Sequence, residues 1–548
     1  MVRERLLYQK DMNKKILLGL FFIFLLGFVL RFYQLGGVPN SLNWDEVSWG
    51  YNAYTIGATG KDEYGSFLPF SFKAFGDYKQ PMYVYLDVIP IIFFGLTAFA
   101  VRFPSALIGS FTIFSVFFLV RELFYQYKKK DNLSLLTALL FAISPWSIQF
   151  SRVAFEANVG IFFTITGVAL LLRGIRANHL FSLLAGACIM SLSCYTYHSQ
   201  KLFTPLLFLT IIILTKDYWV KKKTLIIGIV SFFLLCNIFW IIDGRTTARG
   251  RSVLFTSNQT QILAKSAEEL IYDTAHNDAV GKVLHNRRVI YATTYASNYL
   301  SHFDLNYLIT KGDNPRHHPP GMGNMYLISL PFILLGILFI WKRQRKAAVI
   351  VTSWILLAPI ASSLAVDAPN ASRSLVFLPM WDILAAVGIY TLYEWRHSWL
   401  KPQFVAGVIA ILYLFNFIFY IHNYFGHTNL ATAYDWQYGY RESVIYAHKY
   451  QEKTNKAVFF SGSFEQPYIF YLFYAKIDPN NYINQSGSKR ITSQCFSIEN
   501  AYFGKCGGKI KPGDLFISQS EESNSHLVKL NEINYPNEEV GIRMYRYQ

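Results

Sequence analysis

Residues 14–49 read KKILLGLFFIFLLGFVLRFYQLGGVPNSLNWDEVSW, an apolar run that ends in an aromatic and acidic segment. The run itself, Ile16–Phe32, is close to the roughly 20 apolar residues that cross a bilayer as a helix. Five basic residues precede it: Arg3, Arg5, Lys10, Lys14 and Lys15. This asymmetry predicts a cytoplasmic N-terminus, and the lack of a small-residue cleavage site argues against a removed signal peptide. The acidic pair Asp45-Glu46 is then expected just outside the membrane.

The composition of the whole chain is typical of a membrane protein. Of its 548 residues, 53% are apolar and only 16% are charged, whereas soluble domains carry about 25% charged residues. Such a composition excludes a disordered chain, a coiled coil or a collagen. In a soluble protein the formal net charge of +17 would indicate nucleic acid as a partner. Here the basic residues instead follow the expected membrane topology, because they concentrate in the predicted cytoplasmic loops.

Ten further apolar runs bring the predicted number of membrane-spanning helices to about eleven. They lie near 102–121, 133–150, 157–172, 180–197, 202–215, 224–242, 325–341, 347–364, 374–393 and 403–421. With this topology the N-terminus and the inner loops hold 21 Lys and Arg residues, and the short outer loops hold three, which is the bias expected of cytoplasmic loops. One more apolar run, Pro81–Ala100, would reverse the bias if it crossed, so we expect it to lie in the outer interface.

The polar segments divide the chain into two parts. Residues 1–421 are predicted to form the membrane module, with a first outer loop at 34–100 and a second outer region at 243–324. Residues 422–548 predict a small α/β domain on the outer side. Its predicted elements are strands at 456–462, 514–519 and 541–547, a helix at 466–476 and a loop at 480–490. The expected fold class is a polytopic α-helical membrane protein with a small extracytoplasmic α/β domain.

The five cysteines are divided between these parts. Three lie in apolar runs and are expected to be packing residues: Cys188, Cys194 and Cys236. Cys495 and Cys506 lie in the predicted outer domain, where a disulfide is permitted. Adjacent histidines such as His317 and His318 seldom hold one metal ion without further ligands, and no matching Cys or His spacing occurs in the sequence. We therefore predict no metal site and no cofactor.

Asp45 and Glu46 are the strongest candidates for chemistry. Taken alone, two carboxylates beside a membrane are explained as solvated acids of a loop. Here they lie among aromatic residues, and the same loop returns to the interface at Gly76-Asp77-Tyr78-Lys79-Gln80-Pro81. A carboxylate can accept a proton from an attacking hydroxyl or amine, and a lysine can neutralise a phosphate. The group suits displacement of a phosphate leaving group, although the acids alone would also suit a divalent cation.

Other polar residues recur at the outer ends of the predicted spans, and each one alone is more often a helix cap or an interfacial anchor. Arg152, Lys201 and Arg373 lie in short outer loops, against the charge bias of that side. An anionic ligand would explain them, and a lipid phosphate is the nearest candidate. The full set of candidate substrate-binding residues is Asp77, Lys79, Arg152, Tyr195, His198, Lys201, Arg316, His318 and Arg373.

Several of these segments together resemble a known family. They are the Asp45-Glu46 pair, the segment Gly76–Pro81, the segment Val101-Arg102-Phe103-Pro104-Ser105-Ala106-Leu107, and Ser144-Pro145-Trp146 with Ser151-Arg152. Over residues 10–420 the chain resembles the GT-C membrane glycosyltransferases of the protein O-mannosyltransferase and aminoarabinose-transferase type, often called phospholipid-carrier-dependent glycosyltransferases. The resemblance implies a bundle of membrane helices with juxtamembrane helices in the first outer loop. It also implies a polyprenyl-phosphate sugar as donor and a lipid, protein or glycan acceptor outside the membrane.

The resemblance also implies roles for single residues. By position, Asp45 matches the catalytic acid of the family, Glu46 matches its partner, and Lys79 matches a contact to the donor phosphate. Here Gln80 separates Lys79 from Pro81, where some members have Lys-Pro directly.

We expect an inverting transfer in which Asp45 is the general base that deprotonates or orients the acceptor. Lys79, Arg152 and Arg373 are expected to hold the leaving phosphate, while Arg316 and His318 cover the donor. The expected location is the plasma membrane, and no nucleic acid is expected as a partner.

Two other functions fit the same residues. A transporter or flippase of lipid-linked sugars would use the same cations without a base, although transporters often show internal repeats and broken helices near the middle of the membrane. A scaffold with an outer interaction domain would bind a ligand without making a product. Turnover of the glycosyl bond of the donor distinguishes an enzyme from both.

Overall fold

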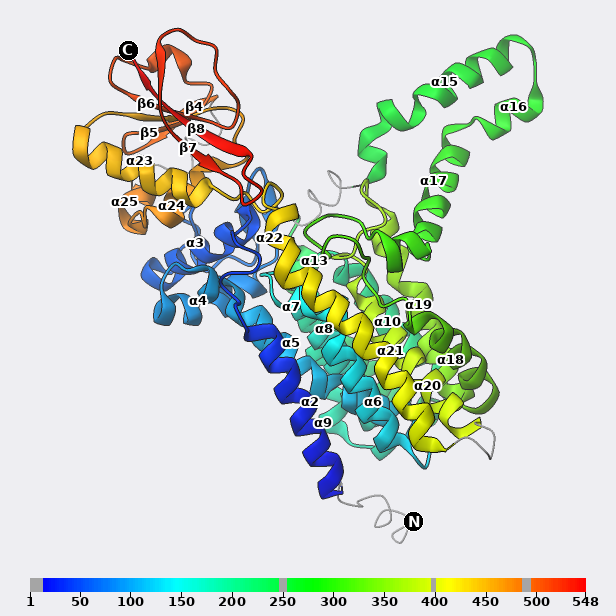
Figure 1. Ribbon diagram of the computed structural model, residues 1–548. Coiled ribbons are helices and arrows are strands. Elements are labelled where there is room, and N and C mark those ends of the chain that lie inside the picture. The colour runs from blue at the N-terminus through cyan, green and yellow to red at the C-terminus, as the bar shows by residue number, and fades with distance from the viewer. Residues whose placement is uncertain (1–12, 246–253, 396–400, 485–493) are drawn as a thin grey trace.

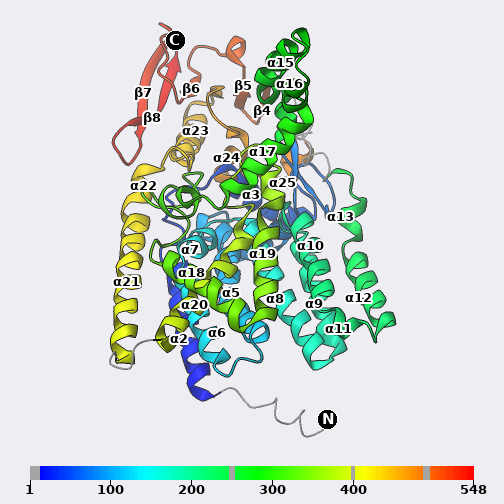
Figure 2. The same cartoon turned by 90° about the vertical axis from the view of Figure 1, so that its right-hand side faces the viewer.

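The computed structural model describes residues 13–245, 254–395, 401–484 and 494–548. Figures 1 and 2 show a bundle of helices that carries two further parts at the end remote from the start of α2 (Lys14–Phe32). One part is a sheet covered by helices near the C-terminus, and the other is an arm of three helices. The first outer loop lies between the bundle and the sheet (Figure 1).

Every predicted span coincides with a helix or with two consecutive helices. After α2 these are α5 (Ala98–Leu123), α6 (Lys130–Ile143), α7 (Pro145–Ser151), α8 (Glu156–Ala177), α9 (Leu180–Ser193), α10 (Gln200–Leu214), α12 (Lys223–Cys236), α13 (Ile238–Ile242), α18 (Ser329–Arg343), α19 (Arg345–Ser363), α20 (Leu378–Trp395) and α21 (Pro402–His422). The short helix α11 (Lys216–Trp219) precedes α12.

Not all of these helices are long enough to cross a membrane by themselves. Within the described residues, six helices are sufficiently long and apolar, and α6 with α7, bent by 58°, makes a seventh as a pair. Helices α9, α10, α12 and α18 have 14 or 15 residues each, fewer than the roughly 20 that a straight span needs. A multi-pass membrane protein is confirmed, and the number of eleven spans stays a prediction.

Helices α18 and α20 pack closely because a glycine of each lies against the backbone of the other. A Cβ on Gly388 would lie 1.8 Å from the carbonyl oxygen of Phe332, and a Cβ on Gly336 would lie 2.0 Å from that of Leu384. Small residues that let two backbones approach are a common device where membrane helices associate. These two glycines therefore fix how close α18 and α20 can lie.

The first outer loop contains ordered elements. Helix α3 (Trp44–Thr59) is followed by a short hairpin of β1 (Phe72–Ala74) and β2 (Asp77–Lys79), and then by α4 (Met82–Phe94). Helix α4 has 13 residues, or about 20 Å of length, which is less than the roughly 30 Å of a bilayer core. It ends at Gly95, so the apolar run 81–100 is divided between α4 and the start of α5. This division is consistent with the expected interfacial position of α4.

The second outer region forms the arm. Its described elements are η1 (Phe255–Asn258), α15 (Gln259–Ala275), α16 (Ala279–Leu284), α17 (Arg287–Ser301) and η2 (Asn306–Thr310). Helices α15 and α16 project from the bundle in both views (Figures 1 and 2). The segment from η2 to α18 instead lies on the bundle, because the Trp146 N–H donates to Asn324 O (3.2 Å) and the Tyr326 hydroxyl donates to Ile143 O (2.6 Å).

The C-terminal region folds around a mixed sheet. Among the described residues its strands have the order β4-β5-β3-β6-β8-β7, and β3 is parallel to β5 and β6. The strands are β3 (Val458–Phe460), β4 (Cys495–Ile498), β5 (Ala501–Gly504), β6 (Leu515–Ser518), β7 (Leu527–Asn534) and β8 (Val540–Tyr547). The helices are α22 (Thr428–Ala431) after η4 (Asn423–His427), then α23 (Tyr440–Thr454), α24 (Pro467–Tyr474), α25 (Pro479–Asn484) and the short η5 (Gly507–Lys509). The short helix η3 (Leu375–Phe377) belongs to the bundle, directly before α20.

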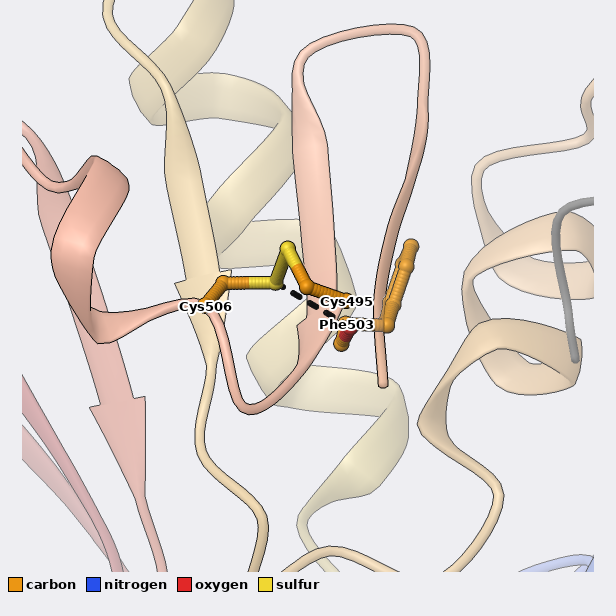
Figure 3. Close-up of a disulfide and its surroundings, with 3 residues drawn as sticks. All are labelled: Cys495, Phe503 and Cys506. Carbon is orange, nitrogen blue, oxygen red and sulfur yellow. Dashed lines mark hydrogen bonds between the residues drawn. A yellow bond between two sulfur atoms is a disulfide. The ribbon is translucent and has the colours of Figure 1, made fainter. Parts of the chain in front are cut away.

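Most elements predicted for this region are present. The strands predicted at 456–462, 514–519 and 541–547 correspond to β3, β6 and β8, and the predicted helix at 466–476 corresponds to α24. The loop predicted at 480–490 was wrong at its start, where Pro479–Asn484 forms α25, and its remainder from 485 lies outside the described residues. A disulfide joins Cys495 of β4 to Cys506 after β5 (Figure 3), where Cys506 Sγ lies 3.2 Å from Phe503 O.

The sheet region and the first outer loop share one apolar core. The side chain of Phe473 on α24 packs against Gly50 of α3, where an added Cβ would lie 2.6 Å from the ring. The Tyr51 hydroxyl donates to Ile477 O (3.1 Å). Helix α3 is therefore held between the bundle and the C-terminal region.

The glycine contact between α18 and α20 predicts a selective loss of stability. We expect Gly388→Leu to lower the unfolding free energy in detergent by about 1–3 kcal/mol or more, because the side chain must displace the backbone of α18. Gly407→Leu on α21 is the matched control, since nothing lies within 4 Å of its added Cβ. Thermal unfolding of both variants tests the prediction, and equal stability of the two would contradict it.

Candidate active site

Helix α3 begins at the acidic pair because Asn43 caps it. The Asn43 side chain accepts from the backbone N–H of Asp45 (2.9 Å) and of Glu46 (3.0 Å), and Glu46 Oε2 accepts from Asn43 N (3.1 Å). This reciprocal pair of bonds is a capping box. Acids in a first turn also interact favourably with the positive end of the helix. The cap turns Asp45 outward, with 44% of its side chain exposed, and Glu46 inward.

Glu46 is buried, and both oxygens of its carboxylate accept hydrogen bonds. The Arg102 guanidinium donates to both carboxylate oxygens, from Nε at 2.8 Å and from Nη2 at 3.1 Å. Ala154 N also donates to Oε1 (3.1 Å). Glu46 thus joins the start of α3 to α5 and to the segment after α7. Its predicted role as catalytic partner of Asp45 stays a prediction, and its contacts are those of an anchor.

Lys79 meets Asp45, as the sequence predicted for the two distant segments. The Lys79 ammonium forms an ion pair with Asp45 Oδ1. The lysine is only 5% exposed, and its Nζ lies 4.4 Å from the ring centroid of Trp49 and 4.8 Å from that of Phe75. Rings at this distance attract a cation. Gly76, with φ +80°, supplies the left-handed turn that reverses the hairpin and presents Lys79.

The loop between α9 and α10 packs against the same hairpin. His198 Nε2 lies 3.1 Å from Tyr78 O, and Met82 N donates to Tyr195 O (3.2 Å). The Lys201 Nζ lies 5.4 Å from the ring of Trp240. Two of the predicted residues, Tyr195 and His198, are therefore direct neighbours of the segment that carries Lys79.

Two further predicted cations lie on loops nearby. The Arg316 guanidinium lies 5.1 Å from the ring of Trp44, the residue before Asp45. Arg373 forms an ion pair with Asp367. Burial lowers the pKa of Arg373, but Tyr197, Asp367 and other partners together raise it above its usual value. Arg373 is thus a permanent charge close to the loop that carries His198.

His318 also lies on the loop of Arg316. Its Nδ1 is 3.1 Å from Pro319 O, and burial lowers the pKa of its imidazole. The ring packs against Gly312, so His318 shapes the loop that carries Arg316.

Followed through contacts, sequence neighbours and one electrostatic interaction, that between Tyr197 and Arg373, these residues make a closed path. The path passes through Asp45, Lys79, Tyr78, His198, Tyr197, Arg373, Ser372, His317, Arg316 and Trp44. One acid and three cations, from four separate segments, belong to it. An anionic group with a transferable substituent is the kind of ligand that such a set can hold.

Two predicted residues have other surroundings. Arg152 is fully buried, and its guanidinium donates to the Tyr424 hydroxyl and to backbone carbonyls. The accepting carbonyls belong to Leu30, Arg31, Tyr33, Gln34 and Val38. These bonds tie the end of α2 to α7 and use all three guanidinium nitrogens. Asp77 Oδ1 accepts from the N–H of Tyr78 (2.7 Å), which stabilises the start of β2.

Glu63 was not among the predicted residues, although it lies close to Lys79. It is fully buried, and its Oε1 accepts from Asn52 Nδ2 (3.2 Å). Burial raises the pKa of the Glu63 carboxyl to about 8, and Lys79 opposes that shift. In the sequence nothing distinguishes Glu63 from a solvated acid. Arg102 was quoted for the family resemblance but its pairing with Glu46 was not predicted, although an arginine at the start of an apolar span is a recognisable signal of a buried partner.

Within the part of the chain that the structure describes, no three His, Cys, Asp or Glu side chains are close enough to share a metal ion. Of the cations on the closed path, Lys79 pairs with Asp45, Arg316 lies over Trp44 and Arg373 pairs with Asp367.

Known proteins share both sequence features and the fold. Residues 21–246 match the family described as dolichyl-phosphate-mannose-protein mannosyltransferase. ArnT from Cupriavidus metallidurans in the apo state is similar with a TM-score of 0.55 at 10% identity, over 96% of this chain and 97% of that chain. ArnT bound to undecaprenyl phosphate gives a TM-score of 0.55 at 11% identity, over 97% and 98%.

The archaeal oligosaccharyltransferase AglB from Archaeoglobus fulgidus, in complex with an inhibitory peptide and a dolichol-phosphate, is similar with a TM-score of 0.50. The identity is 12%, and the match covers 92% of this chain and 69% of that chain. No curated protein is detectably similar in sequence.

The fold is that of the GT-C glycosyltransferase structures ArnT and AglB. Within this fold, residues 21–246 match the dolichyl-phosphate-mannose-protein mannosyltransferase family. The resemblance seen in the sequence is therefore confirmed. The first outer loop does carry two helices, α3 and α4, and their position at the membrane surface stays a prediction.

The buried pair of Glu46 and Arg102 predicts a strong effect on stability. We expect Arg102→Leu to cost about 3–5 kcal/mol, because it leaves the Glu46 carboxylate buried without its partner. Arg121→Leu, at the other end of α5, is the control. Its pair with Asp131 is partly exposed and should contribute at most about 1 kcal/mol. Denaturant unfolding in detergent measures both, and similar losses would refute the anchoring role.

The raised pKa of Glu63 predicts a pH dependence. A carboxyl whose pKa is higher in the folded than in the unfolded protein contributes stability that is fully present below its usual pKa of 4.5 and is lost as pH rises towards about 8. We expect Glu63→Gln, which keeps the neutral shape, to reduce the fall in thermal stability between these pH values. A variant with the same pH profile as the parent chain would show that Glu63 ionises normally.

Proposed function

We propose that this glycosyltransferase transfers a sugar from a polyprenyl-phosphate donor to an acceptor on the outer side of the membrane, with inversion at the anomeric carbon. The observation that carries the proposal is the ion pair between Asp45 and Lys79 at the start of α3. It brings a partly exposed base and a buried cation to the same place. The bound undecaprenyl phosphate of the similar ArnT structure supports the class of donor.

Donor binding would change the partners of the ion pair. While Lys79 contacts Asp45, its positive charge stabilises the carboxylate and makes it a weaker base. A donor phosphate that competes for the Lys79 ammonium removes this restraint. Asp45 then accepts the proton of the acceptor hydroxyl or amine as that group attacks. The ion pair therefore couples the arrival of the donor to the activation of the acceptor.

The transfer itself exchanges one bond for another. The acceptor atom forms a bond to the anomeric carbon from the face opposite the phosphate. The bond between that carbon and the phosphate oxygen breaks, and its electron pair stays on the phosphate. Lys79, with Arg316 and Arg373 on the same closed path, would stabilise this developing charge. We propose no metal for this step, because lysine and arginine supply the positive charge.

The proposed orientation in the membrane rests on the distribution of Lys and Arg between the loops. The inner loops and the N-terminus carry 21 basic residues against three in the short outer loops, which favours a cytoplasmic N-terminus. The start of α2 and the C-terminal sheet lie at opposite ends of the bundle (Figure 1). We propose that residues 422–548 form an extracytoplasmic domain and that the plasma membrane is the location.

Substitution of Asp45 and Lys79 tests the proposal. With labelled polyprenyl-phosphate sugar in membranes or detergent, Asp45→Asn should lower transfer by about 10²–10⁴-fold. Lys79→Ala should lower it by about 10²–10³-fold through loss of electrostatic stabilisation. Addition of EDTA should leave the rate of the parent chain unchanged.

Lys73→Ala is the matched control for Lys79→Ala. Lys73 lies on the partner strand of the same hairpin, opposite Tyr78, with its ammonium near the ring of Tyr64. We expect it to keep nearly full activity. Undiminished transfer by Asp45→Asn would reject the base assignment, and donor binding without turnover by the parent chain would favour a transporter.

A further inference from the structure

A network of three polar side chains joins the two loops that carry Arg316 and Arg373. Asp313 Oδ2 accepts from Ala371 N (2.8 Å) and lies 2.7 Å from His317 Nδ1. On the other side of the imidazole, His317 Nε2 lies 3.3 Å from Ser372 Oγ. The network thus begins on the loop before α18 and ends on the loop between α19 and α20.

The network is enclosed. The side chains of Asp313 and His317 are only 7% and 8% exposed, and the rings of Phe150 and Phe155 lie 5.3 and 5.5 Å from the imidazole. Hydrogen bonds to a charged group are stronger than neutral ones and cost more to break in such surroundings. Burial alone would raise the pKa of Asp313, but His317 and the N–H of Ala371 hold it below its usual value.

Each arginine is the direct neighbour of one network member in the sequence. Arg316 precedes His317, and Arg373 follows Ser372. A bond that fixes His317 to Ser372 therefore fixes the backbone positions from which both guanidinium groups extend. In this structure the two guanidinium groups contact different partners. Arg316 lies over the ring of Trp44, and Arg373 pairs with Asp367.

An acid, an imidazole and a hydroxyl in this order also occur in nucleophilic triads. Here the Ser372 side chain is buried, so an attacking substrate has little access to it. The contacts of the network are with the two loops, which favours a positioning role.

We propose that Asp313, His317 and Ser372 form a clamp that holds the two loops together so that Arg316 and Arg373 can bind the same phosphate of a lipid-linked donor. This inference rests on the proposed function. The three residues are positioning residues, because they act on the phosphate through the two arginines. The clamp would thus set donor affinity without touching the acceptor.

Direct binding of undecaprenyl phosphate to the purified full chain in detergent tests the clamp. We expect Asp313→Asn and His317→Ala to weaken binding about tenfold, the size of one lost charge-assisted hydrogen bond. The KM for the donor should rise while kcat changes less. His317→Gln, which keeps a donor and an acceptor, should recover part of the loss, and Ser372→Ala is the milder variant should the others fail to fold.

His302→Gln is the matched control. His302 also forms a buried bond to a serine, with Nε2 2.7 Å from Ser362 Oγ, but it joins α17 to α19 and no arginine-bearing loop. It should lower stability without changing phosphate binding. A loss of binding equal to that of His317→Ala would overturn the clamp.

A double-mutant cycle separates a clamp from a general loss of structure. If His317 acts through Arg373, then His317→Ala and Arg373→Ala are strongly non-additive, whereas His317→Ala and Lys79→Ala add. Full additivity with Arg373→Ala, or labelling of Ser372 by a fluorophosphonate, would overturn the clamp. A parent chain that neither binds the lipid phosphate nor transfers sugar would instead reject the proposed function.

Discussion

The buried ion pair between Glu46 and Arg102 is the constraint on which the candidate active site depends. It fixes the first turn of α3 against α5, and the capping box with Asn43 then forces the preceding residue, Asp45, to face outward. A charge buried in this way is costly unless every lone pair is satisfied, and Ala154 N completes the set. The two acids of one dipeptide thus have opposite surroundings, one as an anchor and the other as a candidate base.

Much of the fold could be predicted because membrane helices have a strong signal. Apolar runs identified the described helices of the bundle apart from the short α11, and the positions of the basic residues predict an orientation. The short helices α9, α10 and α12 show the limit of this reasoning, since an apolar run does not tell where a helix breaks or bends. The arm of α15 to α17 was not predicted, because its sequence has neither an apolar run nor the alternation of a strand.

The candidate site was predictable only in part, for a physical reason. The pairing of Asp45 with Lys79 could be expected from the return of one loop to the interface. Arg152 was expected to hold phosphate, yet its guanidinium is occupied by backbone carbonyls at the end of α2. The sequence shows that an arginine lies in an outer loop, but not whether it points into that loop or towards a ligand. The same ambiguity hid Arg102 and Glu63.

The packing of Phe473 on Gly50 has a consequence for how this enzyme can evolve. Asp45 lies at the start of a helix that shares its apolar core with the C-terminal region, so α3 and the terminal sheet pack as one unit. Substitutions on the exposed strand β7 are tolerable, but deletion of the sheet would expose the aromatic side chains that pack against α3, the helix that carries Asp45. Exchange of the whole C-terminal region is therefore limited to replacements that bring an aromatic side chain to pack against Gly50.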